Sequence, residues 1–176
     1  MSHRFGEITQ NGYVVPNLDI AMTHWAEVLG VGPWLDFGPL KFDRMVYRGA
    51  PTEAQCRIAV ANSGDLQIEL IEILDDHPSC YREFLDATGG RGGLQHVSSW
   101  PSSEDYDRYV QEFDARGGDV LFEGSGGGTR FIYFDTGLDF GTVFEIADLA
   151  PETKKLFESV REAAKSWDGQ TVLMNG

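Results

Sequence analysis

The sequence predicts an α+β fold in which two βαβββ modules form a cupped, open eight-stranded sheet, followed by a C-terminal helix. Two segments of strand-like alternation, centred on Gln10 and His96, lie 86 positions apart (10 to 96). Each is followed by one amphipathic helix and three further strand candidates. A glycine-rich stretch, residues 89–93, separates the two halves. A duplicated order of this kind predicts two similar modules that share one domain.

The first module is expected at residues 7–87. Its opening strand, residues 7–15, stops at Pro16, and Asn17 can cap the following helix. That helix carries an apolar stripe and ends near Gly30, which suits the left-handed position after a helix. Residues 31–39 contain two Gly and two Pro and are expected to form a loop. Further elements are expected as strands at 44–48, 55–62 and 66–74 and a short helix at 78–87.

The second module, residues 93–149, follows a linker at 88–92 and repeats this order. Its opening strand, 93–100, ends at Pro101, and Ser102 begins the next helix in a capping-box-like pattern. The remaining strands are expected at 119–123, 129–134 and 141–148. The glycine-rich residues 124–128 lack the Lys and the helix of a phosphate loop, so we interpret them as a hairpin loop.

Residues 1–150 are therefore expected to form one domain, and residues 151–176 a helical tail. The tail contains an amphipathic helix at 151–167, which could pack on the body or on a second subunit.

Composition excludes several classes of partner. The chain has 28 acidic and 14 basic residues and a formal net charge of −14, so nucleic acid is not an expected partner. Cys56 and Cys80 are too few and too widely spaced for a disulfide framework or a CxxC metal site. No secretory leader and no apolar run of about 20 residues is present. We expect a cytoplasmic protein that does not enter a membrane.

Four polar residues interrupt the first and last strands of the two modules. These residues are Gln10 and Glu69 in the first module and His96 and Glu145 in the second. Taken alone, His96 could be a satisfied interior histidine, and Glu69 could face solvent. If the modules curve toward each other, however, the four side chains meet at one point. Two carboxylates, an imidazole and an amide suit a divalent metal that keeps positions open for substrate, and no thiolate is present to suggest structural zinc.

The motifs around these residues resemble the vicinal oxygen chelate superfamily. The matching segments are residues 8–19, Leu29-Gly30, Ile68-Glu69-Leu70-Ile71, Leu94-Gln95-His96-Val97 and Gly141-Thr142-Val143-Phe144-Glu145-Ile146. They span about residues 6–149. The superfamily includes glyoxalases, methylmalonyl-CoA epimerases, extradiol dioxygenases and antibiotic-resistance proteins. Residues 135–141 depart from the usual Asp-Pro-Asp-Gly turn.

The resemblance implies four metal ligands, Gln10, Glu69, His96 and Glu145. Gln10 replaces the more common His, which matches the ligand order of the eukaryotic-type lactoylglutathione lyase and disfavours a dioxygenase, because that iron site needs two His. The implied cofactor is one divalent metal, Zn, Ni, Co, Mn or Fe, and we expect a homodimer.

The implied activity is that of a metal-dependent isomerase, epimerase or lyase that removes a proton next to a carbonyl group. Glu145 is the first candidate for the base and Glu69 the second. The alternative is a metal-free protein of the same fold that binds or sequesters a small molecule. Candidate substrate contacts are aromatic, hydroxyl and cationic residues: Tyr13, Tyr47, Arg48, Ser98, Trp100, Arg130 and Tyr133. No basic clamp for glutathione or coenzyme A is evident, so a small ketone, sugar-like or aromatic metabolite is expected.

Overall fold

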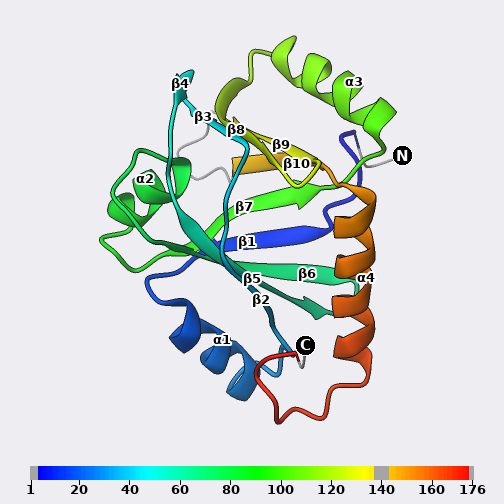
Figure 1. The fold of residues 1–176 in the computed structure, drawn as a ribbon. Coiled ribbons are helices and arrows are strands. Elements are labelled where there is room, and N and C mark those ends of the chain that lie inside the picture. The colour runs from blue at the N-terminus through cyan, green and yellow to red at the C-terminus, as the bar shows by residue number, and fades with distance from the viewer. Residues whose placement is uncertain (1–3, 137–142, 175–176) are drawn as a thin grey trace.

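A computed structural model describes residues 4–136 and 143–174 (Figure 1). Positions 137–142, which include the departure from the usual turn and the first two residues of the strand expected at 141–148, lie outside the described residues. The strands are β1 (Gln10–Val14), β2 (Leu35–Pro39), β3 (Arg44–Tyr47), β4 (Ala50–Pro51), β5 (Cys56–Ser63), β6 (Leu66–Ile73), β7 (Gly93–Ser99), β8 (Asp119–Gly126), β9 (Thr129–Asp135) and β10 (Val143–Asp148). The helices are α1 (Leu18–Glu27), α2 (Cys80–Ala87), α3 (Ser103–Asp114) and α4 (Pro151–Lys165).

The strands form one mixed sheet in the order β2-β5-β6-β1-β7-β10-β9-β8-β3-β4. Its first eight positions are two equivalent halves, β2-β5-β6-β1 and β8-β9-β10-β7, joined where β1 and β7 pair antiparallel. In each half the first strand pairs parallel with the last, β1 with β6 and β7 with β10. The predicted duplication is therefore confirmed, and it places the opening strands of both modules at the centre of the sheet (Figure 1).

The expected number of eight strands is wrong, because the sheet has ten. Residues 31–39, expected to be a loop, contain β2, which pairs with β5 as the second strand of the first module. Its Pro39 is tolerated because β2 forms an edge of the sheet. The strand expected at 44–48 exists as β3, but it pairs with β8 of the second module, and the two-residue strand β4 pairs with β3.

The helices divide the core into three parts. On the outer face, α1 buries Leu18 and Met22 against β5 and β6, and α3 buries Tyr106 and Tyr109 against β9 and β10. The third cluster occupies the inner face, where Tyr81 of α2 and Val160 of α4 are buried among side chains of both modules. Alternation along β6 sends Ile68 and Leu70 outward and Glu69 inward. Alternation along β10 sends Phe144 and Ile146 outward and Glu145 inward.

Two of the predicted helix caps are confirmed. The side chain of Asn17 accepts a hydrogen bond from the backbone N–H of Ile20, and the side chain of Ser102 accepts one from Asp105. A hairpin joins β8 and β9, as expected, but its turn is only Gly127 and Gly128. Residues 124–126, expected in the loop, extend β8 and pair with β9.

The C-terminal helix α4 packs on the body of its own chain, across the ends of the central strands (Figure 1). Beyond it, the chain returns to the loop before β2: the Trp34 N–H donates to the Val172 carbonyl, and the Met174 N–H donates to the Trp34 carbonyl. The ring of Trp167 covers Gly32, where a Cβ would lie 2.9 Å from it. None of the described helices combines the length and apolar character that crossing a membrane requires.

Candidate functional site

The inner face of the sheet borders a half-open cavity of about 320 Å³. Its walls come from both modules, from the residues after β2 and from α4. The lining residues are Gln10, Phe37, Leu40, Lys41, Phe42, Ile58, Glu69, Tyr81, Trp100, Gly126, Gly127, Thr129, Phe131, Tyr133, Glu145, Ala147, Leu149, Thr153 and Phe157. A cavity shared by both halves of a duplicated sheet is a natural position for a binding site.

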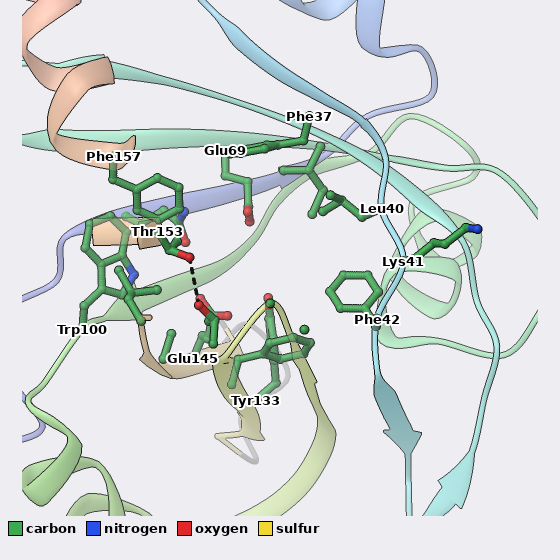
Figure 2. A pocket seen from close by; sticks show the side chains of 18 of the residues that line it. Phe37, Leu40, Lys41, Phe42, Glu69, Trp100, Tyr133, Glu145, Thr153 and Phe157 are labelled. Atoms are coloured by element: carbon green, nitrogen blue, oxygen red, sulfur yellow. Dashed lines mark hydrogen bonds between the residues drawn. The ribbon is translucent and has the colours of Figure 1, made fainter. Parts of the chain in front are cut away.

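The four residues singled out by the sequence converge at this cavity. Glu69 of β6 and Glu145 of β10 extend toward each other from opposite walls (Figure 2). Between them lies fully buried His96, whose Nε2 is 3.4 Å from Glu69 Oε2 and 3.6 Å from Glu145 Oε2. Gln10 of β1 lines the same cavity, and its amide Nε2 donates to Gln67 Oε1 at 2.7 Å, so its carbonyl oxygen is the end left to bind a ligand.

A bulge and a glycine fix the ring of His96. Gly12 pairs with His96 and Tyr13 with Leu94, which leaves Gln95 as an extra residue in β7. Gln95 is buried, and its Oε1 lies 2.8 Å from His96 Nδ1. Because an amide oxygen can only accept, Nδ1 carries the proton. Nε2 then faces the two glutamates, and no described residue forms a hydrogen bond of good geometry with it.

The charges at the site perturb one another. Burial lowers the pKa of His96, but the carboxylates of Glu69 and Glu145 outweigh it, so the pKa is raised above its ordinary value. Burial also raises the pKa of Glu145; the nearby His96 opposes this, Glu69 adds to it, and the hydroxyls of Ser98 and Tyr133 oppose it, with a net increase. The site thus holds two carboxylates that favour a cation between them.

Comparison with known proteins agrees with this arrangement. The sequence model of the Glyoxalase/Bleomycin resistance protein/Dioxygenase superfamily matches residues 9–134. The chain belongs to this superfamily. It is the vicinal oxygen chelate superfamily that the motifs resemble, so that prediction is confirmed. A search of curated proteins found no match.

Solved structures share the fold of this superfamily member. A methylmalonyl-CoA epimerase has a TM-score of 0.55 and 20% identity, covering 81% of this chain and 94% of that chain. The methylmalonyl-CoA epimerase from Mycobacterium tuberculosis has a TM-score of 0.56 and 19% identity, covering 84% and 91%. A hypothetical protein from Bacillus halodurans C-125 has a TM-score of 0.58 and 16% identity, covering 82% and 94%. At these identities the likeness establishes the fold.

The donors of this superfamily member fit a divalent metal in chemical type. An imidazole nitrogen, two carboxylates and an amide oxygen form an acceptable set. Neighbouring ligands of an octahedral metal, at about 2.1 Å from the ion, stand about 3 Å apart. The observed 3.4 and 3.6 Å contacts exceed this by a few tenths of an ångström. Across the described residues, no group of three His, Cys, Asp or Glu side chains is already close enough to hold a metal ion, so binding would require these side chains to move toward one another.

The two glutamates occupy equivalent positions with unequal neighbours. Glu69 lies between Gly12 and Val60 in the sheet, whereas Glu145 lies between Ser98 and Tyr133. Only Glu145 is therefore flanked by two hydroxyl groups. Ser98 Oγ is buried and has no hydrogen-bond partner of good geometry among the described residues.

Two of the predicted substrate contacts line the cavity, and a third lies behind it. Trp100 forms part of the wall beside Phe157 (Figure 2). Tyr133 lines the cavity with its ring 4.9 Å from that of His96 and its hydroxyl 2.9 Å from the hydroxyl of Tyr81. Ser98 is fully buried beside Glu145 and does not line the cavity.

The other four predicted contacts lie away from the cavity. Tyr13 packs against Trp25 on the outer face, with ring centroids 5.0 Å apart. Tyr47 and Arg48 both bind the carboxylate of Glu83. The fourth, Arg130, has its own partners: its guanidinium pairs with Asp107 and Asp148 and lies over the ring of Tyr106. The three side chains Tyr47, Arg48 and Arg130 are thus committed to partners at the surface.

Sequence patterns missed most of the apolar wall. Phe37 comes from β2, Leu40 and Phe42 come from the segment that joins β2 to β3, and Thr153 and Phe157 come from α4. Phe157 contacts both other parts of the wall: its ring lies 6.5 Å from Phe37 and 5.1 Å from Trp100. The concentration of Phe and Trp in residues 34–42 was a usable signal, but their direction depends on β3 crossing to the second module.

Proposed function

We propose that this protein is a metal-dependent enzyme of the isomerase, epimerase or lyase type, which removes a proton from a carbon next to a carbonyl group. The observation that carries the proposal is the convergence of Glu69, His96 and Glu145 at one end of an otherwise apolar cavity. Such a site combines cation-binding groups, a candidate base and mainly apolar walls.

Four residues would hold the metal: Gln10, Glu69, His96 and Glu145. When bound, a divalent metal would polarise the carbonyl group and stabilise negative charge on the substrate oxygens. The protein supplies the rest. Gln95 fixes the tautomer of His96, and Gln67 orients the amide of Gln10. The apolar walls hold the carbon skeleton, which brings the acidic carbon to the carboxylates.

Glu145 is our candidate for the base, with Glu69 as the second candidate. When Glu145 accepts the proton, its carboxyl becomes a hydrogen-bond donor and needs an acceptor. Ser98 Oγ lies beside it with unused hydrogen-bonding capacity, whereas Glu69 has Gly12 and Val60 as neighbours in the sheet. The raised pKa of Glu145, caused chiefly by burial, also favours a base that operates near neutral pH.

The finer reaction type is part of this proposal. The methylmalonyl-CoA epimerases share the fold, and epimerisation is one of the reactions that proton removal and return would produce. We also propose, from the superfamily, a homodimer and a cytoplasmic location. Light scattering at two protein concentrations tests the first, and fractionation of the source cells tests the second.

A metal-free binding protein is the second candidate. The favouring observation is that a protonated His96 can pair with Glu69 and Glu145, which satisfies the charges without a metal. In that case the four polar residues would act only as hydrogen-bonding groups of the pocket.

Metal analysis of the purified protein distinguishes the two candidates. We expect about one divalent metal per chain in the wild type, and its loss in His96→Ala. The matched control is His24→Ala, because His24 is exposed on α1, far from the cavity. A wild type that holds no stoichiometric metal and gains no activity from added Ni, Co, Mn or Zn would contradict the proposal and favour the binding protein.

A further inference from the structure

Two segments of the same chain that lie outside the four-stranded repeats form part of the cavity wall. The first is the connection after β2, which runs from the edge of one module to the edge of the other. The Leu40 N–H donates to the Cys56 carbonyl in β5, and the Asp43 N–H donates to the Ser125 carbonyl in β8. Residues 40–43 therefore bridge the two arms of the sheet and place Leu40 and Phe42 in the cavity wall.

The second of these segments is α4, which begins beyond the part of the chain that the superfamily model matches. Thr153 and Phe157 face the cavity, and Val160, one turn further on, is fully buried. Phe157 meets Trp100 on one side and Phe37 of β2 on the other (Figure 2). The cavity volume, about 320 Å³, lies at the small end of the range for small-molecule sites, about 300–1,000 Å³.

The chemistry of the walls is strongly divided. The side chains that could bind a metal, Gln10, Glu69 and Glu145, lie at one end of the cavity. Aromatic or aliphatic side chains form most of the remaining wall. Lys41 is the only cation among the described lining residues, and its ammonium group points away from the carboxylates (Figure 2). A ligand with several phosphate groups needs more positive charge than this. A sugar would leave its hydroxyl groups unpaired against the apolar walls.

From this division we infer the substrate class of the site: a compact, mainly apolar carbonyl compound of about one aromatic ring, with its oxygens directed at the polar end. The inference rests on the proposed function for its carbonyl group, and on the cavity for its size and apolar character. It also assigns a role to α4 and to residues 37–42, whose apolar side chains would hold the carbon skeleton of such a substrate.

The inferred substrate class differs from the coenzyme A ester bound by one structural neighbour of this chain. One of them is a Streptomyces coelicolor methylmalonyl-CoA epimerase variant solved with 2-nitronate-propionyl-CoA, with a TM-score of 0.51 and 17% identity, covering 82% of this chain and 98% of that chain. A coenzyme A carrier is far larger than the cavity and would have to extend out of its open side, and Lys41 is the only cation that the described lining offers to the carrier phosphates. The contact of Phe157 with Phe37 and Trp100 forms part of the apolar wall.

Calorimetry with the purified full chain tests this directly, because binding does not require turnover. The probes are phenylacetylcarbinol, an aromatic α-hydroxyketone; erythrulose, a polar α-hydroxyketone; and methylmalonyl-CoA. We expect phenylacetylcarbinol to bind at least tenfold more tightly than the other two. Equal or tighter binding of erythrulose or methylmalonyl-CoA would overturn the inference, and so would the absence of binding by phenylacetylcarbinol.

Variants in β2 and in α4 test whether the ketone binds against the assigned apolar wall. Phe157→Ala and Phe37→Ala should each weaken phenylacetylcarbinol binding about tenfold, while Leu156→Ala, on the exposed side of α4, should leave it unchanged. Melting curves check that each variant folds, and Phe157→Leu, which keeps an apolar side chain, should largely restore binding. Unchanged binding in both alanine variants would refute the assigned wall. If the ketone binds but its α-proton does not exchange, the proposed reaction fails while the assigned ligand class stands.

Discussion

The imidazole of His96 lies directly against Gly12 on the neighbouring strand: a Cβ placed on Gly12 would be 1.8 Å from His96 Cε1. A real side chain cannot approach so closely, so Gly12 and His96 are structurally coupled. We expect Gly12→Ala to displace the ring, to lower the free energy of unfolding by about 1–3 kcal/mol, and to weaken metal binding. Urea unfolding and metal titration measure both effects. Asn11→Ala, on the opposite face of β1, is the control, and equal behaviour of the two variants would contradict the coupling.

Gln95 is expected to act through His96. Its Oε1 accepts the Nδ1 proton and thereby leaves Nε2 free to bind a cation. Gln95→Leu should lower metal affinity about 10- to 100-fold, as is typical when the partner of a metal-binding His is removed. Competition with a chelating dye measures the affinity. Gln111→Leu, on the exposed face of α3, should have no effect, and a Gln95→Leu variant with wild-type affinity would show that the bond is dispensable.

Asp36 is expected to make the stability depend on pH. Burial would raise the pKa of Asp36, but hydrogen bonds from Arg57 and the Gly38 N–H outweigh it, so the pKa is lowered. A carboxyl whose folded pKa is depressed contributes stability above its unfolded pKa of about 4, and that stability is lost as the pH falls through the folded value.

Asp36→Asn should therefore lower the free energy of unfolding by about 1 kcal/mol at pH 7, after allowance for solvent screening. The difference from wild type should shrink as the pH falls below about 4. Urea unfolding at several pH values provides the measurement, with Asp114→Asn, at the exposed end of α3, as control. If wild type and Asp36→Asn differ by the same free energy of unfolding at all pH values, the charge of Asp36 does not contribute to stability.

Val160 tests whether α4 packs on its own chain in solution. Because its side chain is fully buried in the inner core, Val160→Ala should cost roughly 2 kcal/mol, whereas Lys155→Ala, on the exposed side, should cost little. The cost of Val160→Ala should be the same at a high and at a low protein concentration, whether or not two chains associate. A cost that appears only at the high concentration would indicate that α4 packs on a second subunit.

The duplicated architecture could be predicted because its signals are local. Pro16 and Pro101 end the two opening strands, Asn17 and Ser102 cap the two helices, and strand alternation directs Glu69 and Glu145 inward. These patterns depend on a few neighbouring residues. The order of the four polar positions along the chain was therefore enough to bring them to one site.

The boundary of the cavity could not be predicted, because it depends on contacts between distant segments. Gly38 and Pro39 mark residues 31–39 as a loop, yet pairing with β5 makes part of that segment an edge strand. The pairing of β3 with β8 determines where Leu40 and Phe42 lie, and no local pattern specifies that pairing. In the same way, residue type alone suggests a pocket role for Tyr47, Arg48 and Arg130. Each of these side chains instead binds a carboxylate that is distant in the sequence, which no local pattern specifies.

Exchange of the α-proton in D₂O measures the proposed chemistry most directly. The compounds are phenylacetylcarbinol and a panel of other α-substituted ketones, followed by proton NMR with metal-loaded wild type, chelator-treated wild type and Glu145→Gln. We predict exchange well above the buffer rate with the metal-loaded protein, its loss after chelation and its recovery when metal is restored, with roughly a 100-fold or greater reduction in Glu145→Gln. Exchange no faster than in buffer for every ketone, or a rate unaffected by both chelation and Glu145→Gln, would contradict a metal-dependent proton abstraction at this site.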